Sequence, residues 1–421
     1  MKVLVIGSGG REHALVKSLS ESKSIKKVFV CPGNVGMQAQ AKIISMNIKD
    51  HVQVVQFCLV NKIDFVVIGP EDPLVDGLAD SLRAEKIRVF GPSKQAAQLE
   101  GSKIFAKKFM LKANVPTADA EVVNSVASTM MAAETHQAPY ILKADGLAAG
   151  KGVSICKNLD ELKSAAQQLF EKKIFGAAGA RALLEKNLPG YELSILVLTN
   201  GSNFQALPLA QDHKRLKDND VGPNTGGMGT VAPLKIANSL EQKIIRKIIE
   251  PSVAQMKKDK MLFRGVLFVG VMVVDGEPYA LEYNTRFGDP ETQVLLPLIK
   301  NDLGKVFYLL SNGFVEDLQF NNKSAFCIVN AAPGYPEQVQ KNVPIQIPAN
   351  TDEAYILHAG TAKSPDGQLI SAGGRVLNIV AIDESFEKAK QKAYALNAQI
   401  QFEGRQFRTD LGSYQFQRNE T

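Results

Sequence analysis

A glycine-rich segment with two lysines stands between two short apolar runs of the chain. It reads Lys143-Ala-Asp-Gly-Leu-Ala-Ala-Gly-Lys-Gly152 and separates residues 140–143 from residues 153–156. The flanking runs are typical of neighbouring β-strands, so we expect the glycines to form the tip of a hairpin. Glycines let backbone N–H groups approach a phosphate closely, and lysines supply positive charge. The segment therefore predicts a nucleotide-binding hairpin, and the competing interpretation is an ordinary glycine-rich turn.

This segment differs from a P-loop. A P-loop has four residues between its two glycines, then Lys and Ser or Thr, and a helix after them. Here only three residues separate Gly146 from Gly150, Gly152 replaces the Ser or Thr, and a strand is predicted to follow. A hairpin that covers phosphates fits this pattern better than a loop at the start of a helix.

A second polar segment follows the long apolar run at residues 265–274. Glu282 and Asn284 are two positions apart, so on a strand their side chains point to the same face. A carboxylate and an amide oxygen suit Mg²⁺, which usually keeps waters and bridges to substrate phosphates. Arg286, expected on that face too, can bind a carboxylate or a phosphate bidentately. A solvated strand end is the alternative, but the pair and the hairpin together favour a nucleotide-dependent enzyme.

The N-terminal loop, Gly7-Ser-Gly-Gly-Arg-Glu-His13, follows the first predicted strand and opens a helix. A dinucleotide fingerprint would require glycine where Glu12 stands, and the second strand ends in Cys-Pro-Gly-Asn34, without an acid for a ribose. A nicotinamide-dependent dehydrogenase is therefore disfavoured. A helix start behind a glycine loop still binds a phosphate well, although each such loop taken alone could be only a tight turn.

A series of motifs in fixed order resembles the phosphoribosylamine–glycine ligase family of the ATP-grasp superfamily. Beside the hairpin and the N-terminal loop, the motifs are Pro32-Gly-Asn34, Gly69-Pro-Glu71, Glu100-Gly-Ser-Lys103, Gln211-Asp-His-Lys-Arg215, Gly222-Pro-Asn-Thr-Gly-Gly-Met-Gly229, Asn284-Thr-Arg-Phe-Gly-Asp-Pro-Glu-Thr292, His358-Ala-Gly-Thr361 and Gly373-Gly-Arg-Val-Leu377. The resemblance runs from Lys2 to about Gly412, nearly the whole chain.

The resemblance implies a carbon–nitrogen ligase of purine biosynthesis. Its partners would be ATP, glycine and 5-phosphoribosylamine, its products glycinamide ribonucleotide, ADP and phosphate, and its cofactor Mg²⁺ or Mn²⁺. Glycine would first become a glycyl phosphate, and closure of the hairpin would exclude water that hydrolyses this intermediate. Neither nucleic acid nor membrane is an expected partner, and the chain is expected to be a monomer.

The resemblance also implies roles for individual residues, which fall into four groups. The ATP-binding residues would be Lys103, Lys143, Gly150, Lys151, Gly152, Glu185 and Glu192. The phosphoribosylamine-binding residues would be Gly9, Gly10, Arg11, Gly33, Asn34, Gly69, Pro70 and Glu71. Catalysis would rest on Lys143 and Arg286, which neutralise charge on the transferred phosphoryl group, and on Asp212, which could pair with the glycine ammonium. Glu282 and Asn284 would hold the metal.

The chain departs from the family pattern at several positions. Gly270 stands where many ATP-grasp enzymes have another acidic metal ligand, and Lys186 and Tyr191 replace acids near the adenine. The roles of His213 and of the C-terminal matches, His358 and Arg375, stay open between a site wall and a structural part. A non-catalytic nucleotide-binding regulator is the remaining alternative, and the intact metal pair argues against it.

Composition is ordinary for a globular protein. The chain has 421 residues, 45% hydrophobic and 22% charged, with a net charge of +6 that suits anionic small substrates. The four cysteines show no metal-ligand spacing and indicate reduced thiols of a cytoplasmic protein. The first strand begins directly after Met1, which leaves no room for a signal peptide, and no apolar run approaches the ~20 residues of a membrane span.

Alternating predicted strands and helices must position these residues. Strands expected at 2–7, 28–30, 63–69 and 87–90, separated by helices at 12–21, 49–61 and 76–85, predict an open parallel sheet. Further helices are expected at 93–113, 125–136, 160–172 and 240–258, strands at 182–210, 265–283, 325–331, 354–360 and 375–382, and a last helix from Ser385 to Ile400.

The expected fold is a multidomain α/β and α+β protein. Residues 1–101 would form the N-terminal α/β domain with an open parallel sheet, and residues 102–322 the ATP-grasp domain, with a lid subdomain at 116–188. Residues 323–421 would form a small C-terminal α+β domain.

Overall fold

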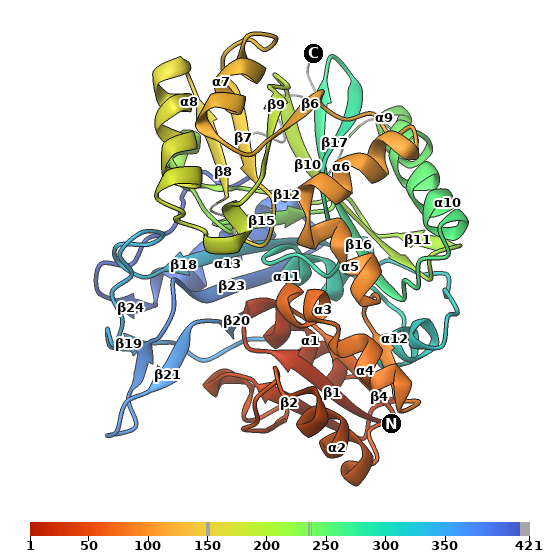
Figure 1. The fold of residues 1–421 in the computed structure, drawn as a ribbon. Helices are drawn as coiled ribbons and strands as arrows, with labels where there is room; N and C mark the ends of the chain where they lie inside the picture. Colours follow the sequence, from red (N-terminus) through yellow and green to blue (C-terminus); the bar gives the residue numbers. More distant parts are fainter. Residues whose placement is uncertain (149–151, 235, 237, 413–421) are drawn as a thin grey trace.

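The computed structural model describes residues 1–148, 152–234, 236 and 238–412. The expected fold class is confirmed: an N-terminal parallel sheet, a central ATP-grasp region and a C-terminal α+β region lie together in the chain (Figure 1). Gly150 and Lys151 of the predicted hairpin lie outside the described residues. Among the described residues, no helix is both long enough and apolar enough to cross a membrane.

The N-terminal sheet is parallel, with strand order β3-β2-β1-β4-β5. Its strands are β1 (Lys2–Gly7), β2 (Lys27–Pro32), β3 (Lys42–Ile43), β4 (Phe65–Ile68) and β5 (Arg88–Phe90), and its helices are α1 (Gly10–Ser20), α2 (His51–Asn61), α3 (Glu71–Asp76) and α4 (Leu78–Ala84), with a 3₁₀ turn η1 (Val35–Met37). Val3 and Val5 pack into the cluster under α1, whereas Leu4 and Ile6 pack into the cluster under α2 and α4. Burial on both faces explains the unbroken apolar run of β1.

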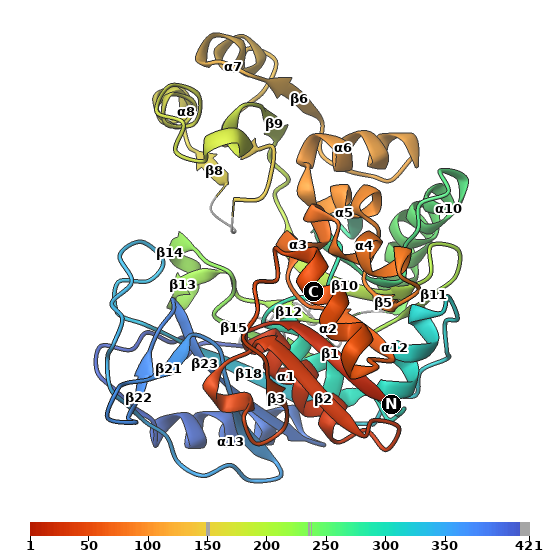
Figure 2. The same ribbon diagram turned by 60° about the horizontal axis from the view of Figure 1, so that its bottom comes forward.

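The lid is a four-stranded sheet of order β6-β9-β7-β8 with two helices on it. It comprises β6 (Ala120–Val123), α7 (Val126–Ala133), β7 (Tyr140–Ala144), β8 (Val153–Cys156), α8 (Leu159–Ala166) with a π-helical extension η2 (Gln167–Glu171), a 3₁₀ turn η3 (Gly176–Gly179) and β9 (Ala182–Lys186). Figure 2 shows that the lid stands apart from the rest of the chain and approaches it beside α6.

The central sheet has the order β11-β10-β16-β17 and is covered by helices on the side of α6 and α10. Its strands are β10 (Tyr191–Thr199), β11 (Phe204–Ala206), β16 (Gly265–Val274) and β17 (Glu277–Asn284). The neighbouring helices are α5 (Lys94–Gly101), α6 (Lys103–Lys112), α9 (Asn238–Ile244), a π-helical turn η5 (Ile245–Ile249) and α10 (Glu250–Lys258), followed later by α11 (Glu291–Leu295), η6 (Leu296–Leu298) and α12 (Leu303–Ser311).

The C-terminal sheet has the order β12-β15-β18-β23-β20. Its strands are β12 (Gln211–Asp212), β15 (Gly229–Ala232), β18 (Ser324–Ala331), β20 (Ala354–His358) and β23 (Arg375–Asp383), and helix α13 (Phe386–Ala398) packs on it. Small pairs are β13 (Arg215–Lys217) with β14 (Val221–Asn224), linked by η4 (Asp218–Asp220), β21 (Thr361–Lys363) with β22 (Leu369–Ser371), and β19 (Ile345–Gln346) with β24 (Gln401–Phe402). Since β12 and β15 precede residue 322, this sheet crosses the expected domain boundary.

Several expected helices differ in detail from those observed. The helix expected at 76–85 is observed as α4 (Leu78–Ala84), and α3, which was not expected, ends just before Gly77, where φ is +99°. The helix expected at 93–113 breaks at Ser102, which has an extended backbone and caps α6 through its hydroxyl. The sequence analysis assigned no helix to α11 or α12. Breaks of this kind come from single residues, whereas the periodicity on either side continues.

Candidate active site

The predicted hairpin is present. Strands β7 and β8 pair antiparallel, with Lys143 opposite Val153, and the Ala144 N–H donates to the Gly152 carbonyl across 2.8 Å. Gly146 has a φ of +143°, a conformation that favours glycine, and a Cβ there would lie 2.8 Å from the Cβ of Ala178. The close approach explains why glycine stands at this position.

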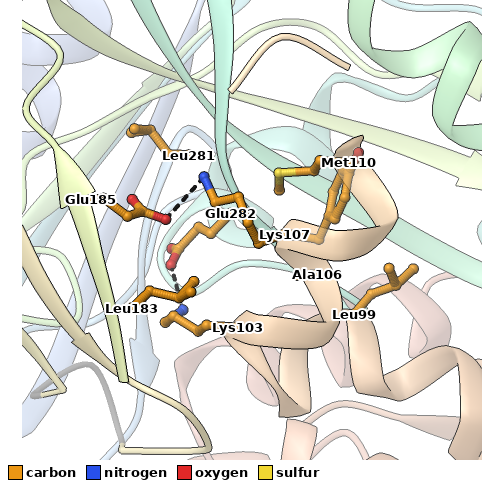
Figure 3. A pocket seen from close by; sticks show the side chains of 10 residues that line it. Leu99, Lys103, Ala106, Lys107, Met110, Leu183, Glu185, Leu281 and Glu282 are labelled. Atoms are coloured by element: carbon orange, nitrogen blue, oxygen red, sulfur yellow. Dashed lines mark hydrogen bonds and ion pairs between the residues drawn. The ribbon is translucent and has the colours of Figure 1, made fainter. Parts of the chain in front are cut away.

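A narrow pocket lies between the lid, helix α6 and strand β17 (Figure 3). Lys103 on α6 reaches Glu282 on β17, with 2.9 Å between Nζ and Oε2. Lys143 on β7 lies 2.5 Å and Lys107 on α6 lies 3.0 Å from the carboxylate of Glu185 on β9. Lys103 therefore lines the pocket together with Lys107, Glu185 and Glu282, and Lys143, the other predicted phosphate-facing lysine, adjoins it through its ion pair with Glu185.

The charges in this pocket are unbalanced. Glu185 is one carboxylate shared by two lysines, and all three side chains are less than a tenth exposed. Burial raises the pKa of Glu185, but Lys143 and Lys107 outweigh it and hold the pKa below the usual value. The buried triad thus carries an excess positive charge, which favours an anionic ligand beside it.

Glu282 and Asn284 provide the oxygen ligands expected for a metal. Lys103 holds the pKa of Glu282 far below its usual range, so this carboxylate is ionised, as a metal ligand must be. Gly270 on β16 pairs with Glu282, and a Cβ at Gly270 would lie 3.5 Å from both Glu282 and Glu192. An acidic residue at position 270 would point between these two carboxylates. The acidic ligand that glycine replaces here would therefore lie beside Glu282, as the sequence predicted. The remaining donors fit a hydrated divalent cation that is also bound by phosphates.

Arg286 is held by several partners that the sequence did not indicate. Its guanidinium lies 2.7 Å from Glu100 on α5 and 3.2 Å from Glu71, and it also reaches the Asn284 amide oxygen at 3.4 Å. Glu71 in turn lies 3.9 Å from Arg11. Burial raises the pKa of Glu71, but Arg286 and Arg11 outweigh it and lower the pKa to about 2. Arg286 is therefore charged and joins the N-terminal loops to the end of strand β17.

The N-terminal loops meet at the carboxyl ends of three strands. The segments after β2 and β4, with Gly33 and Asn34 on one and Gly69, Pro70 and Glu71 on the other, flank the loop after β1. In the sheet, β1 lies between β2 and β4. The Asn34 amide donates to the Ser8 and His358 carbonyls at 2.8 and 2.9 Å, so it ties two of these regions together.

The start of α1 differs from the expected open phosphate cradle. The Gly9 N–H donates to Glu12 across 2.6 Å, so this amide is already used. Asp289 lies 3.4 Å from the Arg11 N–H, and a Cβ at Gly10 would collide with Asn378 and lie 2.9 Å from the amide nitrogen of Gln293. The protein's own carboxylates occupy this helix N-terminus in place of a free anion site. Phosphate binding by Gly9 and Gly10 stays a prediction.

A second group of carboxylates lies around Asp212, which is half-buried, and includes the buried Glu291. Burial, and then Glu291, raise the pKa of Asp212 well above its usual value, and its Oδ1 has no hydrogen-bond partner within the described part of the chain. Lys214 pairs with Glu192, which lies on β10, and lowers the pKa of Asp212. A Cβ at Gly227 would lie 2.5 Å from Asp212, so glycine leaves room in front of that carboxylate. Two acids near one another favour a cationic ligand.

His213 and His358, whose roles the sequence left undecided, both contact structural partners. His213 is buried, its Nδ1 contacts the Gly229 carbonyl at 3.2 Å, its Nε2 accepts from the Gly412 N–H at 3.2 Å, and burial lowers its pKa to about 4. His358 is also buried, with Thr361 at 3.1 Å from Nδ1. Arg375 donates to the Asp289 carbonyl at 2.6 Å and to the Gly226 carbonyl at 2.7 Å. These contacts support a structural role for His213 and join Arg375 to the site loops.

The sequence missed other residues that the structure brings to the site. Lys107 carried no signal except its position one turn after Lys103 on α6. Glu100, Lys214, Asp289 and Glu291 all lie inside motifs that were recognised, but nothing in their spacing assigned them a partner.

The fold and the site define an ATP-grasp enzyme. The biotin carboxylase domain of the Hydrogenobacter thermophilus 2-oxoglutarate carboxylase, solved with magnesium ADP, superposes with a TM-score of 0.74 at 19% identity over 96% of this chain and 91% of that one. At this identity the likeness shows the fold alone. ATP-grasp enzymes use ATP with a divalent metal ion.

Sequence comparison is more specific. The phosphoribosylglycinamide synthetase N domain matches residues 1–100, the ATP-grasp (A) domain residues 101–292 and the C domain residues 325–414. The chain belongs to the phosphoribosylglycinamide synthetase family, and it is accordingly an ATP-dependent ligase.

Proteins similar to this chain over its full length support the same family. The phosphoribosylamine–glycine ligase of Agrobacterium fabrum is 43% identical over 416 residues, 98% of each chain, and that of Caldanaerobacter subterraneus is 38% identical over 420 residues, 98% of this chain and 100% of the other. The crystal structure of the Thermotoga maritima phosphoribosylamine–glycine ligase has a TM-score of 0.85 at 35% identity, covering 97% of this chain and 100% of that one.

Proposed function

We propose that the chain joins glycine to 5-phosphoribosylamine at the expense of ATP, in the cytoplasm and as a monomer. We assign ATP to the pocket because of the charged side chains in and around the pocket. Lys103 and Lys107 line the pocket, Lys143 pairs with Glu185 at its edge, and the described lining residues include two carboxylates, Glu185 and Glu282, for these three lysines. Entry of a polyphosphate would give the lysines new anionic partners. The buried free thiols of the four cysteines suit a reducing compartment.

The first chemical step activates a poor electrophile. A glycine carboxylate oxygen attacks the γ-phosphorus of ATP, the bond to the β–γ bridging oxygen breaks, and its electrons leave with ADP. Lys143 and Arg286 face negative charge that develops on the transferred group, and fixed charges in a buried site stabilise such a transition state without reorganising. Arg286 keeps its position because Glu100 and Glu71 hold it.

The second step forms the carbon–nitrogen bond. The phosphoribosylamine nitrogen attacks the glycyl carbonyl carbon, phosphate departs with the electrons of the carbon–oxygen bond, and the nitrogen loses a proton. No side chain has to become covalently attached. A closed lid is needed between the two steps, because water would otherwise hydrolyse the glycyl phosphate.

Glu282 and Asn284 would hold the metal ion, Mg²⁺ or Mn²⁺. That ion would supply Lewis acidity and positive charge to the phosphate oxygens. Glu192 lies on the other side of the Gly270 position and is neutralised by Lys214. Lys214 thus compensates the second carboxylate, so that the ligand set keeps one carboxylate and one amide.

Glycine binds with its ammonium group at Asp212. The unpartnered Oδ1 of Asp212 and its repulsion from Glu291 support this subsite, since an ammonium ion relieves both. Gly227 leaves the space for it. The loops with Gly9, Arg11, Asn34 and Glu71, all within the expected N-terminal domain, bind phosphoribosylamine.

One experiment tests the function directly. ADP release is measured with freshly prepared phosphoribosylamine, glycine and ATP, omitting each substrate in turn. ADP release that requires both glycine and phosphoribosylamine, with glycinamide ribonucleotide as the product, supports the proposal. ADP release that ignores glycine would refute it, and so would turnover of another amino acid in preference to glycine.

A further inference from the structure

Asp145 joins the lid to helix α6. It follows strand β7 directly, and its carboxylate is only 6% exposed. Its Oδ1 accepts from the Ser102 hydroxyl at 2.7 Å and from the Ile104 N–H at 3.1 Å, both at the start of α6. Its Oδ2 lies 2.8 Å from Arg181 of the lid. One carboxylate therefore satisfies the first turn of a helix in another subdomain.

The two ends of this contact lie next to the two lysines that are proposed to bind ATP. Asp145 is two residues after Lys143, and Ser102 immediately precedes Lys103. Ser102 is the N-cap of α6 and also accepts from the Phe105 N–H at 3.1 Å. Its hydroxyl thus bonds at the same time to its own helix and to the lid.

Helix α6 meets the lid at a second place, one turn further on. There Lys107 binds Glu185 of β9 and the Ala118 carbonyl at the base of the lid. The contact at Lys107 lies inside the pocket, where a ligand would disturb the charges. The contact at Asp145 uses the helix N-terminus, where a carboxylate is favourable because four N–H groups have no partner within the helix.

We propose that Asp145 is a positioning residue for the ligation: through Ser102 and the Ile104 amide it seats the phosphate hairpin on the start of α6, so that Lys143 and Lys103 face the same phosphates and water stays out. Arg181 contributes little, since its side chain is 58% exposed and exposed ion pairs are weak. The inference rests on the proposed assignment of the hairpin and both lysines to ATP.

The test uses three variants of the contact and one control in the full-length protein. Asp145→Ala removes both carboxylate oxygens, Asp145→Asn keeps an acceptor for Ser102, and Ser102→Ala removes the hydroxyl. The matched control is Ser125→Ala. Ser125 is the N-cap of the lid helix α7, and its hydroxyl accepts from the Ser128 N–H. ADP and glycinamide ribonucleotide are both quantified, with the KM for ATP and the melting temperature.

The expected pattern is graded. Asp145→Ala raises the KM for ATP by about tenfold or more, as expected for losing hydrogen bonds to a charged group, and forms ADP in excess of glycinamide ribonucleotide. Asp145→Asn and Ser102→Ala show the same changes more weakly. Ser125→Ala lowers the melting temperature but forms both products equally. A merely structural role would lower the melting temperature of all variants without changing this ratio.

The possible outcomes distinguish an error in the role of Asp145 from an error in the assignment of the hairpin to ATP. Equal products and an unchanged KM for ATP in Asp145→Ala would overturn the inference; if that variant does not fold, the same result in Ser102→Ala and Asp145→Asn would overturn it. Lys143→Met serves as a reference. If this variant also leaves the KM for ATP unchanged, the proposed assignment of the hairpin to ATP fails instead.

Discussion

Replacing Glu282 by Gln tests the metal site most directly. The substitution keeps the size of the side chain but removes the charge that faces Lys103 at 2.9 Å. Because Gly270 leaves the site without a further acid, the metal would lose its sole charged ligand on β17. Loss of one charge-stabilising group typically costs about 100- to 1,000-fold in kcat. We expect a loss in that range and a higher metal concentration for half-maximal rate.

Glu282→Gln should destabilise the protein less than the loss of a fully buried ion pair would. Breaking a fully buried ion pair costs about 3–5 kcal/mol, but Glu282 is 29% and Lys103 22% exposed, and solvent screens the lysine that is left. We therefore expect a loss of about 1–2 kcal/mol in the free energy of unfolding, measured by urea denaturation.

Glu277→Gln is the matched control for this prediction. Glu277 lies at the other end of β17 and also pairs with lysines, at 2.7 Å from Lys243 and 2.5 Å from Lys247, but it is far from the pocket. ADP release is measured for both variants over a range of Mg²⁺ and Mn²⁺ concentrations. Near-normal kcat of Glu282→Gln at saturating metal, or an equal loss in both variants, would refute the metal assignment.

Three further predictions concern single residues of the other subsites. Gly152→Val should raise the KM for ATP, because a Cβ there lies 2.7 Å from the Cβ of Ala148 and a branched side chain would displace the hairpin; unchanged ATP affinity would show the hairpin to be an ordinary turn. Asp212→Asn should raise the KM for glycine by about tenfold or more while stabilising the protein at high pH. The sign follows from the raised pKa of Asp212: the folded state favours the protonated acid, so its contribution to stability is present at low pH and is lost as the pH rises through the folded-state pKa. Melting temperatures of both proteins between pH 5 and 9 check this, and a gap between them that does not widen with pH would contradict it. Gly10→Val should weaken phosphoribosylamine and leave ATP affinity unchanged in a fluorescence titration; weakened ATP with an unaffected KM for phosphoribosylamine would reverse the assignment of the two phosphate sites.

Features set by local pattern were predictable from the sequence. The hairpin at 143–152 follows from glycines between two apolar runs, and the side-by-side placement of Glu282 and Asn284 follows from the two-residue period of a strand. The start of helix α6 at Lys103 is also set locally, by the Ser102 cap, although the single helix expected at 93–113 ran through this break. Each of these needs only residues that are neighbours in the chain.

Features set by distant pairing were not predictable. Strands β12 and β15 join the C-terminal sheet although they lie far before it in sequence, and no local pattern records which sheet a two-residue strand will enter. Lys107 looks like a surface lysine on a helix, and only the lid places Glu185 against it. A charged residue shows its chemistry in the sequence, but its partner is a property of the fold.

The folded structure also connects predicted sites that are separate in the sequence. From the motifs alone, the loops expected to bind phosphoribosylamine and the metal ligands expected on strand β17 are separate sites. In the structure a row of alternating charges connects them: Glu12 binds Arg11, Arg11 approaches Glu71, Glu71 binds Arg286, and Arg286 binds Glu100. Glu100 in turn accepts from the N–H of Thr285 at 2.8 Å, and Thr285 stands between Arg286 and Asn284, the proposed metal ligand. Since charges in contact restrain one another's positions, we expect that phosphoribosylamine, if it binds Arg11 or Glu71 as proposed, also influences the position of Arg286.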